Sequence, residues 1–136
     1  MFPFAAFWQE QDILERQKIK LLTASEASKE LEQRRSIKRT LISILQYRGL
    51  TNDLAQDTEA TLKAILCLLA ASPVYALVLN LEDLWLETKP QNVPGTLRKQ
   101  NWTRKTALSL EKLEKAKDIN QFLSEITHLR KGVNHT

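Results

Sequence analysis

Cysteine, histidine, glycine and proline are all scarce in this chain of 136 residues. The single cysteine, Cys67, excludes an internal disulfide and a zinc site built from several thiolates. With only two histidines besides, we expect no metal centre and no cofactor. Three glycines and four prolines exclude collagen and the all-β architectures that need frequent turns. The composition therefore favours a mostly helical globular chain.

Long hydrophobic runs are also lacking. The longest one covers residues 64–79 and is interrupted by Ser72 and Pro73, whereas a membrane-spanning helix needs ~20 apolar residues. The apolar start of the chain has no basic segment before it and reaches Glu10 within a few residues, unlike a secretory signal. We expect a cytoplasmic protein without a membrane partner.

The excess of positive charge is small, at a formal net charge of +4. Its densest cluster, Arg34, Arg35, Lys38 and Arg39, alternates with apolar residues at helical spacing. We interpret the cluster as the solvated face of a helix. A stripe that binds nucleic-acid phosphates is the alternative, although no aromatic ladder accompanies it, and we expect no nucleic-acid partner.

Apolar periodicity predicts helices over most of the chain. The first covers residues 7–22. Thr23 and Glu26 form a capping-box pattern that starts a second helix, which extends to about Arg48 and has Gly49 as its C′ residue. Asp57 is placed to cap a third helix, which Pro73 ends.

One segment has the composition of a strand. Residues 74–79 are a run of strand-forming residues without polar alternation, which is typical of a strand buried on both faces of a parallel sheet. The chain has no second run of this quality, and a lone strand leaves its backbone groups unpaired. This pattern predicts an incomplete domain.

A polar, turn-rich segment follows from Glu87 to Thr106. After it, a final helical region is expected in two pieces that end near Gly132. Ser109 is predicted to cap the first piece, and Asp118 with Gln121 the second. None of these patterns identifies a nucleophile with its base, so they do not predict the function.

Two motifs resemble a known family. Leu81-Glu-Asp-Leu-Trp-Leu-Glu87, with Asn92-Val-Pro-Gly-Thr96 and Asn101-Trp-Thr-Arg104, resembles the C-terminal region of the 4-α-glucanotransferases, which are the amylomaltases or disproportionating enzymes of glycoside hydrolase family 77. The opening segment from Ala5 to Arg16 resembles the A-G-x-W-x-x-x-D-I-x-x-R stretch of the same family. The resemblance covers nearly the whole chain.

The resemblance implies a fold and a division of the chain. The family fold is a (β/α)8 TIM barrel, so the fold class is expected to be mostly α with one buried strand, as the C-terminal part of such a barrel. Residues 1–72 would be the helices after the seventh strand. Residues 73–106 would be the eighth strand and an active-site loop, and residues 107–136 the closing helical region of this single incomplete domain.

The resemblance also implies an activity. Family members transfer segments of α-1,4-glucans between maltooligosaccharides with retention of configuration, through a carboxylate nucleophile and a carboxylic acid. The three catalytic carboxylates of the family would precede Met1, so no catalytic residue is assigned here. The isolated chain is expected to be inactive, and an upstream barrel fragment is a possible partner.

For glucan contact, the resemblance points to Asn92, Val93, Pro94, Gly95 and Trp102. The amide of Asn92 would bind sugar hydroxyls, with a turn-stabilising role as its alternative. Trp102 would line a subsite or pack the loop, and Arg104 is expected to pair with a local carboxylate such as Glu87. A stand-alone helical protein-interaction module without catalytic activity remains the alternative to the enzyme fragment.

Overall fold

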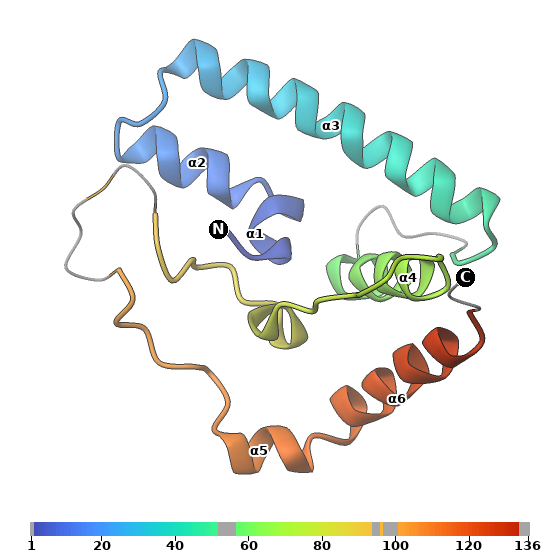
Figure 1. Cartoon of the computed structure of the whole chain (residues 1–136). Helices are drawn as coiled ribbons and strands as arrows, with labels where there is room; N and C mark the ends of the chain where they lie inside the picture. Colours follow the sequence, from blue (N-terminus) through green and yellow to red (C-terminus); the bar gives the residue numbers. More distant parts are fainter. Residues whose placement is uncertain (1, 52–56, 94–95, 97–100, 134–136) are drawn as a thin grey trace.

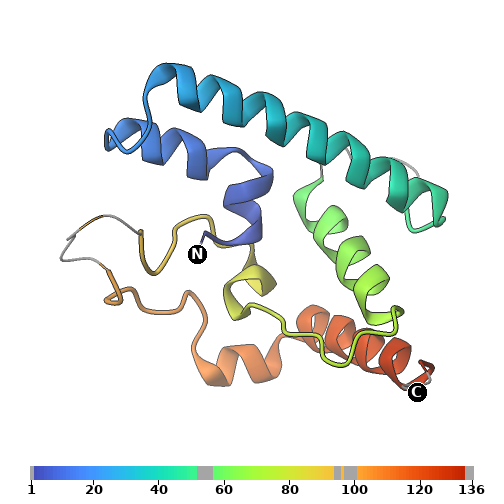
Figure 2. The same ribbon diagram turned by 45° about the horizontal axis from the view of Figure 1, so that its top comes forward.

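The computed structural model describes residues 2–51, 57–93, 96 and 101–133. Within them the chain forms α1 (Phe4–Trp8), α2 (Gln11–Lys18), α3 (Ala24–Tyr47), α4 (Thr58–Ala70), the 3-10 helix η1 (Leu81–Trp85), α5 (Leu110–Lys115) and α6 (Lys117–Lys131). The long helix α3 lies on one side of the molecule, and α5 and α6 lie on the opposite side (Figures 1 and 2). The short helix α1 contacts both α2 and α4, and α6 packs against α4.

The caps predicted for three helices are confirmed. The Thr23 hydroxyl accepts from the Glu26 amide, and the Glu26 carboxylate accepts from the Thr23 amide at 2.8 Å, which completes a capping box. Asp57 accepts from two backbone amides at the start of α4, and Ser109 accepts from one at the start of α5. Side-chain oxygens thus satisfy backbone donors that a helix leaves without partners in its first turn.

Two predictions of helix boundaries are wrong. The first helix is broken in two at Glu10, which has a left-handed φ of 65°. A helix cannot continue through such a residue, so α2 leaves α1 in a new direction (Figure 1). In addition, α6 begins at Lys117 after Ala116 and no side chain caps it, so the predicted cap at Asp118 is not formed.

The predicted fold class is also wrong. No strand is present in the described ranges, and residues 74–79 have irregular backbone. The carbonyl oxygens at the start of this segment accept hydrogen bonds from the Arg130 guanidinium of α6, at 2.7 Å for Val74 and 3.2 Å for Tyr75. A strand needs a ladder partner, and high strand propensity does not supply one. The buried strand and the barrel portion are therefore not seen.

The main apolar cluster lies between α4 and α6. Leu62, Leu66 and Ala70 of α4 pack against Phe122 and Ile126 of α6. Leucine side chains from the irregular segment, at positions 77 and 79, pack against the same cluster. Burial of these side chains fixes the segment that leads into η1 and the loop after it.

Across the part of the chain that the structure describes, no helix is long and apolar enough to cross a membrane.

Candidate functional site

The motif at residues 81–87 contacts the start of α1, directly before the opening motif. The carboxylate of Asp83, in η1, accepts a hydrogen bond from the backbone amide of Phe4 at 2.7 Å. Phe4 is the first residue of α1, so this carboxylate satisfies one of the backbone donors that the helix leaves open. Partial burial raises the pKa of Asp83, and the Phe4 hydrogen bond opposes that shift without cancelling it.

A buried ion pair holds α2 on α3. Both oxygens of Asp12 accept from the guanidinium of Arg34, each at 2.9 Å. The same guanidinium lies over the Phe7 ring, with its carbon 3.6 Å from the ring centroid, and donates to the Phe7 carbonyl. Arg34 is 8% exposed. The solvated face predicted for this basic cluster is therefore wrong at Arg34, because a tertiary partner desolvates it.

Other cations of this region have partners too. Lys38 donates to the Trp8 carbonyl at 2.7 Å and lies 3.3 Å from a carboxylate oxygen of Glu10. Arg16 forms a two-bond pair with Glu30. Cations thus bind the carbonyl end of α1, where the helix dipole favours positive charge, and α1 is fixed at both of its ends.

The loop after η1 is ordered by Glu87. Its carboxylate accepts from the backbone amides of Thr88 and Lys89 at 3.0 and 2.9 Å, and from Arg104 at 3.0 Å. The predicted pair between Arg104 and Glu87 is confirmed. Burial raises the pKa of Glu87, but the two amides and the guanidinium outweigh it, so that the pKa lies below its usual range.

Asn101 cross-links the same loop. Its side-chain oxygen accepts from the Val93 amide at 3.4 Å, and its side-chain nitrogen donates to the Thr96 carbonyl at 3.2 Å. Next to it, the Trp102 amide donates to the Gln91 carbonyl at 2.7 Å. Both arms of the loop are therefore tied together at this point.

The predicted site residues lie in different surroundings. Val93 is buried and Asn92 is half-buried. Trp102 is 74% exposed and has a left-handed φ of 63°. Pro94 and Gly95 lie outside the described residues. The structure thus brings Val93 and Trp102 into one loop through Asn101, and it leaves the Trp102 ring in solvent.

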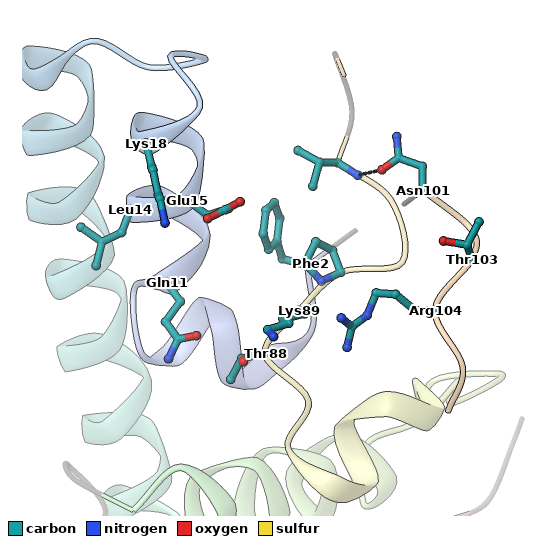
Figure 3. Close-up of a pocket in the computed structure, with 12 residues that line it drawn as sticks. Phe2, Gln11, Leu14, Glu15, Lys18, Thr88, Lys89, Asn101, Thr103 and Arg104 are labelled. Carbon is teal, nitrogen blue, oxygen red and sulfur yellow. Dashed lines mark hydrogen bonds between the residues drawn. The ribbon is translucent and has the colours of Figure 1, made fainter. Parts of the chain in front are cut away.

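A pocket of about 620 Å³ lies between this loop and the N-terminal helices (Figure 3). The wall on the N-terminal side is lined by Phe2, Gln11, Leu14, Glu15 and Lys18. The wall formed by the loop is lined by Thr88, Lys89, Pro90, Val93, Asn101, Thr103 and Arg104. Of the predicted site residues that the structure describes, only Val93 lines it. Sequence reasoning missed the α2 residues, since nothing local to α2 indicates that a distant loop will cover it.

The described ranges contain no group of three or more His, Cys, Asp and Glu residues that could hold an ion. The thiol of Cys67 lies 3.8 Å from a carboxylate oxygen of Glu125. Burial is the main cause that raises the pKa of this thiol, and the negative charge of Glu125 raises it further. A thiol with a raised pKa is a poor nucleophile.

These features define a helical chain with a pocket of mixed polar and apolar lining between its N-terminal helices and an ordered loop. A family model described as 4-alpha-glucanotransferase, glycoside hydrolase family 77, matches residues 1–110. Because the match spans more than half of the chain, the chain belongs to this family. Neither the comparison with curated proteins nor the comparison with solved structures gives a match.

Proposed function

We propose that the chain is the glucan-contacting part of a 4-α-glucanotransferase that transfers α-1,4-glucan segments between maltooligosaccharides with retention of configuration. The observation that carries this proposal is the match of the family model to residues 1–110, which include both walls of the pocket. The loop residues Asn92, Val93, Pro94, Gly95 and Trp102 are the proposed contacts to sugar.

The backbone at Trp102 supports a role for its side chain. A left-handed φ of 63° is rare for a bulky residue, costs ~1–3 kcal/mol and persists only where the surroundings hold the backbone in place. Here the Trp102 amide is held by the Gln91 carbonyl while the ring stays in solvent. An exposed aromatic ring on a fixed backbone offers a flat apolar face, and such a face suits the apolar side of a sugar ring.

The catalytic acids are proposed to come from a further polypeptide segment, such as an upstream fragment. Retaining transfer needs two carboxyl groups ~5–5.5 Å apart. Among the described residues that line the pocket, Glu15 alone carries a carboxylate. Glu87 lies beside the pocket, but two backbone amides and Arg104 already occupy its oxygens. The isolated chain is therefore proposed to bind glucan without transferring it.

The first test incubates the pure 136-residue chain with maltotriose and analyses the products by chromatography. No change in oligosaccharide length is expected. Glucose and longer oligosaccharides formed by the pure chain would contradict the missing-acid part of the proposal.

The second test measures binding of maltoheptaose to the chain and to Asn92→Ala. The variant is expected to bind more weakly, whereas Asn120→Ala, whose exposed side-chain amide donates to the Glu114 carbonyl, serves as the matched control. Equal binding by both variants and the wild-type chain would contradict the role of Asn92.

A stand-alone interaction module is the second candidate, and one observation favours it. Tyr75 and Val78, in the irregular segment, are 96% and 88% exposed. Large apolar side chains at such exposure suit a contact with another protein. Where the partner is a second copy of the chain, light scattering at increasing concentration tests this candidate, because the chain should then associate and Val78→Ser should prevent the association.

A further inference from the structure

Two lysines face the pocket from opposite walls. Lys18 lies in the last turn of α2, and Lys89 belongs to the loop on the other side (Figure 3). Neither ammonium group has a carboxylate partner among the described residues. By contrast, the neighbouring cations Arg16, Arg34, Lys38 and Arg104 each have one. Carboxylates therefore neutralise these four cations, whereas the positive charges of Lys18 and Lys89 face the pocket without such a partner among the described residues.

Two cations in a concave site raise the local positive potential, which attracts and concentrates anions. Arg104 adds a third positive group to the lining, although Glu87 neutralises it. Glu15 is the single carboxylate of the lining within the described part of the chain. The described lining of the pocket thus carries a net positive charge, and binding of a neutral glucan does not require such a charge.

We propose that this pocket binds the phosphate ester of a small saccharide. A phosphate monoester carries a charge of about −1.5 to −2 at pH 7 and has three acceptor oxygens, which two ammonium groups can share. The volume of about 620 Å³ lies within the ~300–1,000 Å³ of small-molecule sites, so the pocket has room for a sugar as well as its phosphate.

The rest of the lining suits the sugar. The Phe2 ring projects into the pocket and offers an apolar face, while the Thr88 hydroxyl and the Gln11 amide offer hydrogen bonds (Figure 3). The choice of a saccharide rests on the proposed function, whereas the choice of an anion rests on Lys18 and Lys89. The substrate would then be a glucan or sugar that carries phosphate at one end.

The test is a calorimetric titration of the full chain with glucose 6-phosphate, glucose, maltotriose and inorganic phosphate. Glucose 6-phosphate is expected to bind at least roughly tenfold more tightly than glucose, because it adds charge-assisted hydrogen bonds. Its affinity is expected to fall as salt rises, whereas the affinity of glucose is not.

Substitutions of single lysines test whether Lys18 and Lys89 cause the tighter binding of glucose 6-phosphate. Lys18→Gln and Lys89→Gln are each expected to weaken glucose 6-phosphate several-fold and to leave glucose binding unchanged. Lys115→Gln removes the same charge on α5, outside the pocket lining, and is the matched control. Circular dichroism checks that each variant keeps its helices.

The outcomes separate this proposal from the proposed function. Equal affinity for glucose 6-phosphate and glucose overturns the anion site, and binding of maltotriose in that experiment leaves the proposed function intact. Inorganic phosphate bound as tightly as glucose 6-phosphate also overturns the proposal, because the sugar then contributes nothing. Absence of binding by all four compounds contradicts both.

Discussion

Asp83 accepts a hydrogen bond from the Phe4 amide at 2.7 Å, so η1 and the first turn of α1 are joined although they lie far apart in the sequence. Partial burial raises the pKa of Asp83 because the ionised carboxylate loses hydration. The hydrogen bond and the desolvation therefore act in opposite directions on the charged form. This contact joins the motif at residues 81–87 to the residue directly before the opening motif, and its energetics can be tested.

Replacement of Asp83 by asparagine is expected to keep or slightly increase stability at pH 7. The amide oxygen still accepts from Phe4, and no charge is desolvated. Because the pKa of Asp83 is higher in the folded protein than in the unfolded chain, protonation of Asp83 stabilises the fold. This contribution is complete below the unfolded pKa of ~3.9 and is lost as pH rises through the folded-state pKa. The advantage of Asp83→Asn should therefore vanish on acidification.

Urea unfolding at pH 7 and at a pH below ~3.9 measures this difference. Asp83→Ala is the comparison, since it removes the acceptor and should cost about 1 kcal/mol at pH 7. If Asp83→Asn costs as much as Asp83→Ala at pH 7, the account of Asp83 is wrong.

Loss of the Arg34 guanidinium is expected to be the most destabilising change on α3. Arg34→Met removes the bidentate partner of the buried Asp12 and leaves it only the Arg16 guanidinium, 3.7 Å away, so the cost is expected to approach the ~3–5 kcal/mol of a broken buried ion pair. Arg39→Met, at an exposed position on the same helix, is the matched control and should change stability by less than ~0.5 kcal/mol. Similar unfolding midpoints for the two variants would contradict the structural role of the pair.

The loop around Glu87 should loosen in acid. The pKa of Glu87 lies below its usual range, so the stability that its carboxylate contributes is present above the unfolded pKa of ~4.3 and is lost as pH falls through the folded value. The protection of the Thr88 and Lys89 amides against hydrogen exchange should decrease through this window. Glu87→Gln should abolish the pH dependence, and a wild-type profile in that variant would refute the assignment.

Trp102→Gly separates stability from binding. Glycine adopts the left-handed backbone without strain but increases the freedom of the unfolded chain, and each effect is of the order of 1 kcal/mol. The free energy of unfolding should therefore change little, while the loss of the exposed ring weakens binding of maltoheptaose. A stable variant that binds as the wild-type chain does would show that the ring does not contact glucan.

Local signals in the sequence predicted the local parts of the fold. Thr23, Asp57 and Ser109 were predicted as caps and confirmed, because a cap depends on residues within one helical turn. The Arg104–Glu87 pair was also predicted, since both residues lie in the same polar loop.

Features that depend on distant residues were not predictable in the same way. The run at residues 74–79 has strand propensity, but a strand requires a partner that the described residues do not provide. Arg34 reads as a surface cation, and only contact with Asp12 and Phe7 buries it. The family motif that runs into α2 does not indicate which of its residues face the distant loop, so the places of Gln11 and Lys18 in the pocket became visible only in three dimensions.

The central claim is that this member of the 4-alpha-glucanotransferase family contacts glucan at the loop beside the pocket. An NMR titration of the labelled chain with maltoheptaose tests this claim most directly. We expect progressive shifts of the amides at positions 91–93 and 101–104 and on α2, with α6 unchanged. Shifts confined to α6 and the segment before η1, or no shifts at all, would contradict the claim.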